Sequence, residues 1–217
     1  MKIIFCLSIL LFLNCQDKKN TAIKHKVNES SLEKSKIINH EPNGILFINE
    51  NLSRKDTINF YNKDGSLWYK FTFFYDDSDG DFEYHNESFK PLAFHPDYFL
   101  LSLKTVKKLN NKYKVIVNEE KKLKKYINKK HFLTFTSIEN YILSKVSSIE
   151  FDKKNNPILE KPHERSEKVL FEKNHKYIPN EISGNWLQVY WKRNKKNYGW
   201  VKWKENENII IKLNHIM

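Results

Sequence analysis

Runs of β-branched and aromatic residues, each followed by a turn signal, recur through the middle of this 217-residue chain. This pattern limits the possible folds of the chain more than any other feature of the sequence. The clearest pair is Thr57–Tyr61 and Leu67–Tyr75, which flank Asn-Lys-Asp-Gly-Ser at residues 62–66. Asp-Gly between two such runs is a strong hairpin signal, because both residues tolerate the positive φ angles that a tight turn needs. Successive hairpins of this kind predict an antiparallel sheet.

The same alternation continues to residue 151 and includes one helix. Ser137 can cap a short helix that runs to Ser144, since Ile138, Tyr141 and Ile142 share one helical face. Four further runs have strand-like composition: Phe99–Val106, Tyr113–Val117, His131–Thr136 and Val146–Phe151. We therefore predict a mainly β, α+β fold.

The charge balance is basic, with a formal net charge of +12, but it does not favour a nucleic-acid partner. Among the 38 lysines and arginines, the only arginines are Arg54, Arg165 and Arg193. Nucleic-acid-binding proteins use arginine for bidentate contacts with phosphate and guanine. We expect no nucleic-acid partner and interpret the charge as suited to an anionic surface.

The N-terminus carries a targeting signal. Ile3–Leu13 is an apolar run that is too short to span a bilayer, which takes about 20 apolar residues. It ends at Cys15, and polar residues follow at once. This order resembles a bacterial lipoprotein signal, which implies a signal peptide over 1–14, lipidation of Cys15 and a membrane anchor facing the periplasm or the cell surface. The alternative is an ordinary secretory signal.

Two composition breaks divide the rest of the chain. The polar tract 15–42 predicts a flexible tether, and Asp152–Pro157 predicts a domain boundary near residue 156. We expect a β-rich α+β domain over 43–156 and a second folded segment over 157–217. Short β-like runs recur in that segment at 169–171, 186–191, 199–203 and 209–213.

The last segment resembles a known family. Gly-Asn-Trp-Leu-Gln-Val at 184–189, a basic turn, and Tyr-Gly-Trp-Val at 198–201 resemble the central hairpin of bacterial SH3-like (SH3b) domains. The match spans about residues 157–214. The resemblance implies a small five- or six-stranded β-barrel that binds cell-wall glycan, peptide or protein in the envelope.

Aromatic and basic residues of this hairpin are the candidate ligand-binding groups. Side chains alternate between core and surface along a strand, and aromatic surfaces bind sugar rings and peptides. We expect Trp186 and Trp200 in the core. The residues predicted at the binding surface are Tyr190, Trp191, Lys192, Lys195, Tyr198 and Trp203.

Catalytic and metal signatures are missing from the sequence. Envelope cysteine peptidases need a thiolate beside a histidine, whereas Cys15 is the only cysteine that remains once the signal and its Cys6 are removed. His163-Glu164 begins like a zinc-peptidase motif but lacks the second histidine. We predict no catalytic residues, no metal and no cofactor.

Two charged stretches have alternative interpretations. The acidic stretch 76–83 resembles a calcium loop in composition, but Phe82 occupies the position that an EF-hand gives to glycine, which favours a solvated loop. The segment 104–130 carries eleven lysines. It forms either a solvated face or a surface that docks on anionic lipid headgroups or wall polymers.

These observations predict a non-enzymatic envelope lipoprotein that acts as a binding module for cell-wall peptidoglycan or an envelope protein. The alternative is a periplasmic inhibitor or immunity lipoprotein that binds a toxin or a hydrolase. A hydrolase with an unrecognised site is a third hypothesis.

Overall fold

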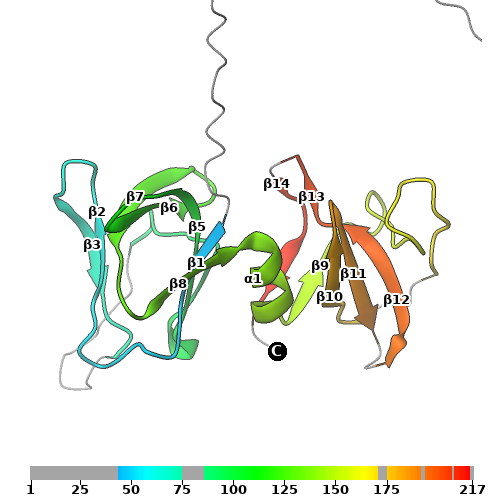
Figure 1. Ribbon diagram of the computed structural model, residues 1–217, viewed down its shortest axis with the longest axis horizontal. Helices are drawn as coiled ribbons and strands as arrows, with labels where there is room; N and C mark the ends of the chain where they lie inside the picture. Colours follow the sequence, from blue (N-terminus) through cyan, green and yellow to red (C-terminus); the bar gives the residue numbers. More distant parts are fainter. Residues whose placement is uncertain (1–43, 75–85, 171–174, 192–193, 207, 216–217) are drawn as a thin grey trace, which may run out of the picture. The chain divides into compact units, whose positions relative to one another are not determined.

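A computed structural model describes residues 44–74, 86–170, 175–191, 194–206 and 208–215 (Figure 1). Its architecture is mainly β with one short helix, which confirms the predicted fold class. The signal peptide, Cys15, the tether and the acidic stretch 76–83 lie outside the described residues.

The first part of the described chain forms one large antiparallel sheet. The order of its hydrogen-bonded strands is β3-β2-β7-β6-β5-β1-β8, and β4 pairs with β5 outside this path. The strands are β1 (Gly44–Ile48), β2 (Ile58–Tyr61), β3 (Leu67–Phe71), β4 (Ala93–His95), β5 (Leu100–Lys108), β6 (Lys112–Asn118), β7 (Leu123–Asn128) and β8 (Leu133–Ser137). A 3-10 turn, η2 (Pro96–Tyr98), follows β4.

The predicted hairpin around residues 62–66 is confirmed. Strands β2 and β3 pair across the turn at 62–66, where the Asn62 N–H donates to the Ser66 carbonyl oxygen at 2.9 Å. Gly65 has a φ of +90°, which is the left-handed geometry that the Asp-Gly pair predicted. Strands β5 and β6 form the second hairpin.

The large sheet bends around an aromatic core. The rings of Tyr113 on β6 and Phe135 on β8 stack with centroids 6.0 Å apart. Strands β5 and β1 lie between them, so a flat sheet would separate these side chains by about 14 Å. The curvature encloses a cluster of buried aromatic residues that comprises Phe60, Phe71, Phe73, Phe89, Tyr113 and Phe132.

Helix α1 (Ile138–Lys145) confirms the predicted cap and helical face. The Asn140 N–H donates to Ser137 Oγ at 3.1 Å, and Tyr141 and Ile142 are buried. The Tyr141 ring lies 5.8 Å from the ring of Phe47 on β1. The helix therefore covers the face of β1 opposite the aromatic core, because Leu46 belongs to that core and its neighbour Phe47 points away from it.

Small antiparallel sheets follow the helix. Strands β10, β11 and β12 form a three-stranded sheet, β13 pairs with β14, and β15 pairs with β9. The strands are β9 (Ser148–Glu150), β10 (Ile178–Ser183), β11 (Trp186–Trp191), β12 (Asn194–Lys202), β13 (Lys204–Glu205), β14 (Asn208–Ile209) and β15 (Lys212–Asn214).

Interactions cross the predicted boundary near residue 156. Strand β9, which precedes it, pairs with β15 near the end of the chain. Asn156 itself donates its Nδ2 to the Lys202 carbonyl oxygen at 2.7 Å and accepts the Lys202 N–H at 3.0 Å. One core cluster includes Tyr141 from α1 and Trp203 from the C-terminal segment. The division into separate domains at this point stays a prediction.

Two strand predictions for the last segment differ from the structure. Val169 and Leu170 lie outside any strand, and the Leu170 side chain is exposed. The run 209–213 is split, since β14 ends at Ile209 and β15 begins at Lys212. Hydrophobic composition alone did not show which of these residues pair in a sheet.

Candidate functional site

The hairpin of β11 and β12 places two predicted tyrosines together on its outer face. Leu187 and Val189 are buried on the inner face, and Tyr190 points the other way. Tyr190 pairs directly with Tyr198 in the antiparallel register, so both side chains lie on the same face. Tyr198 is 49% exposed and Tyr190 is partly buried.

Both tryptophans that were predicted at the binding surface are buried, and that part of the prediction is wrong. Trp191 is only 5% exposed, because it continues the inward-facing series and its ring lies 5.8 Å from that of Tyr177. Trp203 is 1% exposed, and its Nε1 donates to the Gly184 carbonyl oxygen at 3.0 Å. Both indoles belong to the hydrophobic core rather than to a binding surface.

Of the two tryptophans predicted in the core, Trp200 is buried and Trp186 is partly buried. Trp200 lies on the outer face, opposite Gln188, and is 7% exposed. The backbone N–H of Trp200 donates to the Leu159 carbonyl oxygen at 2.7 Å, and the backbone N–H of Leu159 donates to the Trp200 carbonyl oxygen at 2.8 Å. On the outer face, Trp200 is thus buried whereas Tyr198 is half-exposed.

The basic turn follows directly on this tyrosine pair. Lys192 lies outside the described residues, and Lys195 is described by its backbone alone, as part of β12. The register shifts between Tyr190 and Trp191, where Trp191 pairs with Asn194. The described backbone therefore places Lys195 at the same end of the hairpin as the Tyr190–Tyr198 pair.

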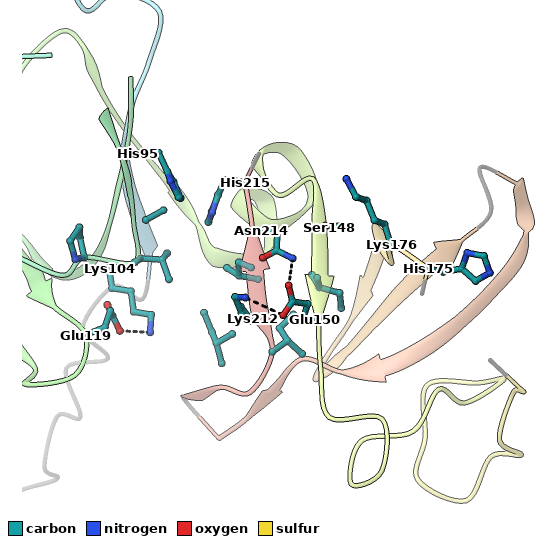
Figure 2. Close-up of a pocket in the computed structure, with 17 residues that line it drawn as sticks. His95, Lys104, Glu119, Ser148, Glu150, His175, Lys176, Lys212, Asn214 and His215 are labelled. Atoms are coloured by element: carbon teal, nitrogen blue, oxygen red, sulfur yellow. Dashed lines mark hydrogen bonds and ion pairs between the residues drawn. The ribbon is translucent and has the colours of Figure 1, made fainter. Parts of the chain in front are cut away.

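A cavity of about 810 Å³, which the sequence did not predict, lies among β4, β5, β9 and β15 (Figure 2). Ion pairs occupy its walls. Lys104 Nζ lies 2.7 Å from Glu119 Oε2, and Lys212 Nζ lies 3.1 Å from Glu150 Oε2. Asn214 Nδ2 also donates to Glu150 Oε1 at 3.0 Å. These hydrogen bonds from Lys212 and Asn214 lower the pKa of Glu150.

Three histidines, His95, His175 and His215, line the same cavity. Burial, and secondarily the charge of His95, lowers the pKa of His215 to about 4, so its imidazole is neutral near pH 7. The His215 ring lies 5.6 Å from that of Tyr141, and its Nε2 has no hydrogen-bond partner among the described residues. Burial raises the pKa of Tyr141 to about 12, and its hydroxyl donates to Ser102 Oγ at 2.6 Å.

The cavity is thus a polar hollow in which two lysine charges are balanced by carboxylates. Its residues come from distant parts of the sequence, and each histidine stands alone in the chain, so no local motif marks them. Within the described ranges, no group of three or more histidine, cysteine or acidic residues is placed to hold a metal ion. No helix in that same part of the chain is long and apolar enough to cross a membrane.

Comparisons with protein-family models, with curated proteins and with solved structures found no match to this chain. The resemblance to bacterial SH3-like domains stays a prediction.

Proposed function

We propose that this chain is an envelope-anchored lipoprotein whose β11–β12 hairpin binds cell-wall peptidoglycan. The observation that carries the proposal is the pairing of Tyr190 with the half-exposed Tyr198 on the open end of the outer face. Aromatic rings present flat apolar surface to sugar rings and peptide segments, with a hydroxyl available for hydrogen bonding. The lipoprotein-like signal ending at Cys15 supports an envelope location.

The basic turn supplies a second, electrostatic component of binding. Lys192 and Lys195 are close in sequence to the tyrosine pair, and the wall peptide carries carboxylates. Attraction between exposed charges is screened by salt beyond about 8 Å at physiological ionic strength, whereas contact with the tyrosine rings is not. Binding should therefore divide into a salt-sensitive part and a salt-resistant part.

Co-sedimentation with purified peptidoglycan sacculi tests the proposal. The mature chain carrying Cys15→Ser, which removes the lipid, is mixed with sacculi over a series of salt concentrations. Tyr198→Ala should weaken the salt-resistant binding, and Lys192→Glu with Lys195→Glu should abolish the salt-sensitive part. Tyr98→Ala is the matched control, because Tyr98 is also exposed, at 63%, but lies in η2, outside the β11–β12 hairpin.

Two results would contradict the proposal. Equal binding by the Tyr198→Ala and Tyr98→Ala variants would remove the hairpin from the site. A wild-type chain that ignores sacculi but co-purifies with an envelope enzyme or toxin would instead support the inhibitor or immunity hypothesis.

A further inference from the structure

A second surface with unbalanced positive charge lies on the outer face of the large sheet. One row of residues crosses four neighbouring strands in register: Tyr61 on β2 pairs with Tyr126 on β7, Tyr126 with Lys114 on β6, and Lys114 with Lys107 on β5. Residues that pair directly point to the same face of a sheet. The adjacent row, with Phe60 and its partner on β7, is buried in the aromatic core, so the first row faces outward.

Further lysines flank this row. Lys70 on β3 pairs with Asn59, which shares the outward face with Tyr61, and Lys124 on β7 pairs with Ile116. Lys112 on β6 places its Nζ 4.8 Å from the centroid of the Tyr126 ring. We call this surface the lysine–tyrosine face; it consists of Tyr61, Lys70, Lys107, Lys112, Lys114, Lys124 and Tyr126.

The charges of this face have no counter-ions in the described part of the chain. Strands β2, β3, β5, β6 and β7 contain no aspartate or glutamate. None of the five lysines lies within 4.0 Å of a carboxylate oxygen of the described residues, in contrast to Lys104, which is paired with Glu119. Lys107 and Lys114 are directly opposite each other, and like charges in this position destabilise a sheet.

We infer that the lysine–tyrosine face binds an acidic polysaccharide. A linear chain of charged sugars would neutralise the opposed lysines and lay its rings against the tyrosines. The row spans about 14 Å across four strands, which is an extended track rather than a point contact. Nucleic acid fits less well because these strands carry no arginine.

This inference does not depend on the proposed function, since the face belongs to a different sheet from the β11–β12 hairpin. The test uses the mature chain with Cys15→Ser and polygalacturonate, a carboxylated polysaccharide, with neutral dextran of equal length as the reference polymer. Affinity is measured by isothermal titration calorimetry at low and physiological salt. Wild-type protein should bind polygalacturonate, lose affinity as salt rises, and bind dextran at least tenfold more weakly.

The Lys107→Glu variant distinguishes an effect on polysaccharide binding from an effect on protein stability. The substitution replaces two opposed lysines with an opposite-charge pair, so the melting temperature should stay equal or rise while affinity for polygalacturonate falls at least fivefold. Lys154→Glu is the matched control: it changes the net charge equally but lies in the exposed turn after β9. Tyr61→Ala should weaken the binding that remains at physiological salt.

Several outcomes would overturn the inference. One is equal affinity for the Lys107→Glu and Lys154→Glu variants. A second is loss of polygalacturonate binding in Tyr198→Ala, which would move the site to the β11–β12 hairpin. Tighter binding of the wild-type protein to single-stranded DNA or to phosphatidylglycerol vesicles than to polygalacturonate would assign the face to another polyanion.

Discussion

Gly199 provides a sharp test of how the C-terminal sheet is packed. It stands in the Tyr-Gly-Trp-Val run on β12, next to the segment whose Leu159 exchanges two backbone hydrogen bonds with Trp200. A Cβ atom on residue 199 would overlap the Ile158 Cγ2 methyl and lie 3.1 Å from the Leu159 carbonyl oxygen. The glycine is therefore required by the close approach of the Ile158 side chain and the Leu159 backbone rather than by an unusual φ angle.

The expected cost of Gly199→Ala follows from these contacts. Overpacking a core costs about 1–3 kcal/mol, and we expect about 2–3 kcal/mol here because one neighbour is a backbone atom that cannot rotate away. Ile158 is 1% exposed, so Ile158→Ala alone should cost about 2–5 kcal/mol. The double variant should cost at least about 1 kcal/mol less than the sum, because Ile158→Ala removes the overlapping methyl.

Urea unfolding followed by tryptophan fluorescence measures the free energies of unfolding of the wild-type chain, the two single variants and the double variant, which together form a double-mutant cycle. Gly65→Ala serves as the control, since Gly65 has a φ of +90° and open space around its Cα. That variant should be destabilised by backbone strain, with no coupling to Ile158→Ala. Additive free energies in the Gly199 cycle would refute the packing argument.

Three further predictions follow from the core and the cavity. Folding lowers the pKa of His215 from 6.5 to about 4, so the unfolded chain binds more protons than the folded chain between these pH values. The free energy of unfolding should therefore fall by about 2 kcal/mol as the pH drops from 6.5 to 4, a value that allows for the partial exposure of the imidazole. Unfolding titrations should show that His215→Gln flattens this dependence. Trp203→Phe should lower the free energy of unfolding by about 2 kcal/mol, because it removes a hydrogen bond and replaces the indole with a smaller ring, and it should leave sacculus binding intact. Loss of sacculus binding with unchanged stability would instead place Trp203 at the ligand-binding surface. A chain of residues 138–217, which keeps α1 and β9, should unfold at a higher urea concentration than residues 157–217, and equal midpoints would mean that β9 contributes nothing to the C-terminal core.

Local signals predicted the elements whose geometry is set within a few residues. The Asp-Gly turn closed the β2–β3 hairpin, and Ser137 capped α1, because a turn angle and a cap hydrogen bond depend on adjacent residues alone. Strand β11 matches its predicted range, since its sequence, Trp-Leu-Gln-Val-Tyr-Trp, consists largely of strong β-forming residues.

Strand β7 shows why other elements could not be found. Its sequence, Leu-Lys-Lys-Tyr-Ile-Asn, places Lys125 on the same side as the buried Ile127, which breaks the expected alternation of apolar and polar residues. In the fold, Lys125 donates to Asn62 Oδ1 at 2.6 Å and its Nζ lies 4.9 Å from the Trp68 ring centroid. These partners come from the β2–β3 hairpin and are invisible in the local sequence.

The sequence by itself determined the mainly β fold class, the hairpin turns, the helix cap and the clustering of tryptophans near the C-terminus. It did not determine which faces are covered. Alternation within a strand fixes which side chains share a face, but only the packing of another segment decides whether that face is buried. Trp191 is buried on the inner face of the C-terminal sheet, whereas Trp200 is buried and Tyr198 half-exposed on the same outer face. The cavity histidines and the row of tyrosines and lysines likewise exist only because strand pairing brings distant residues together.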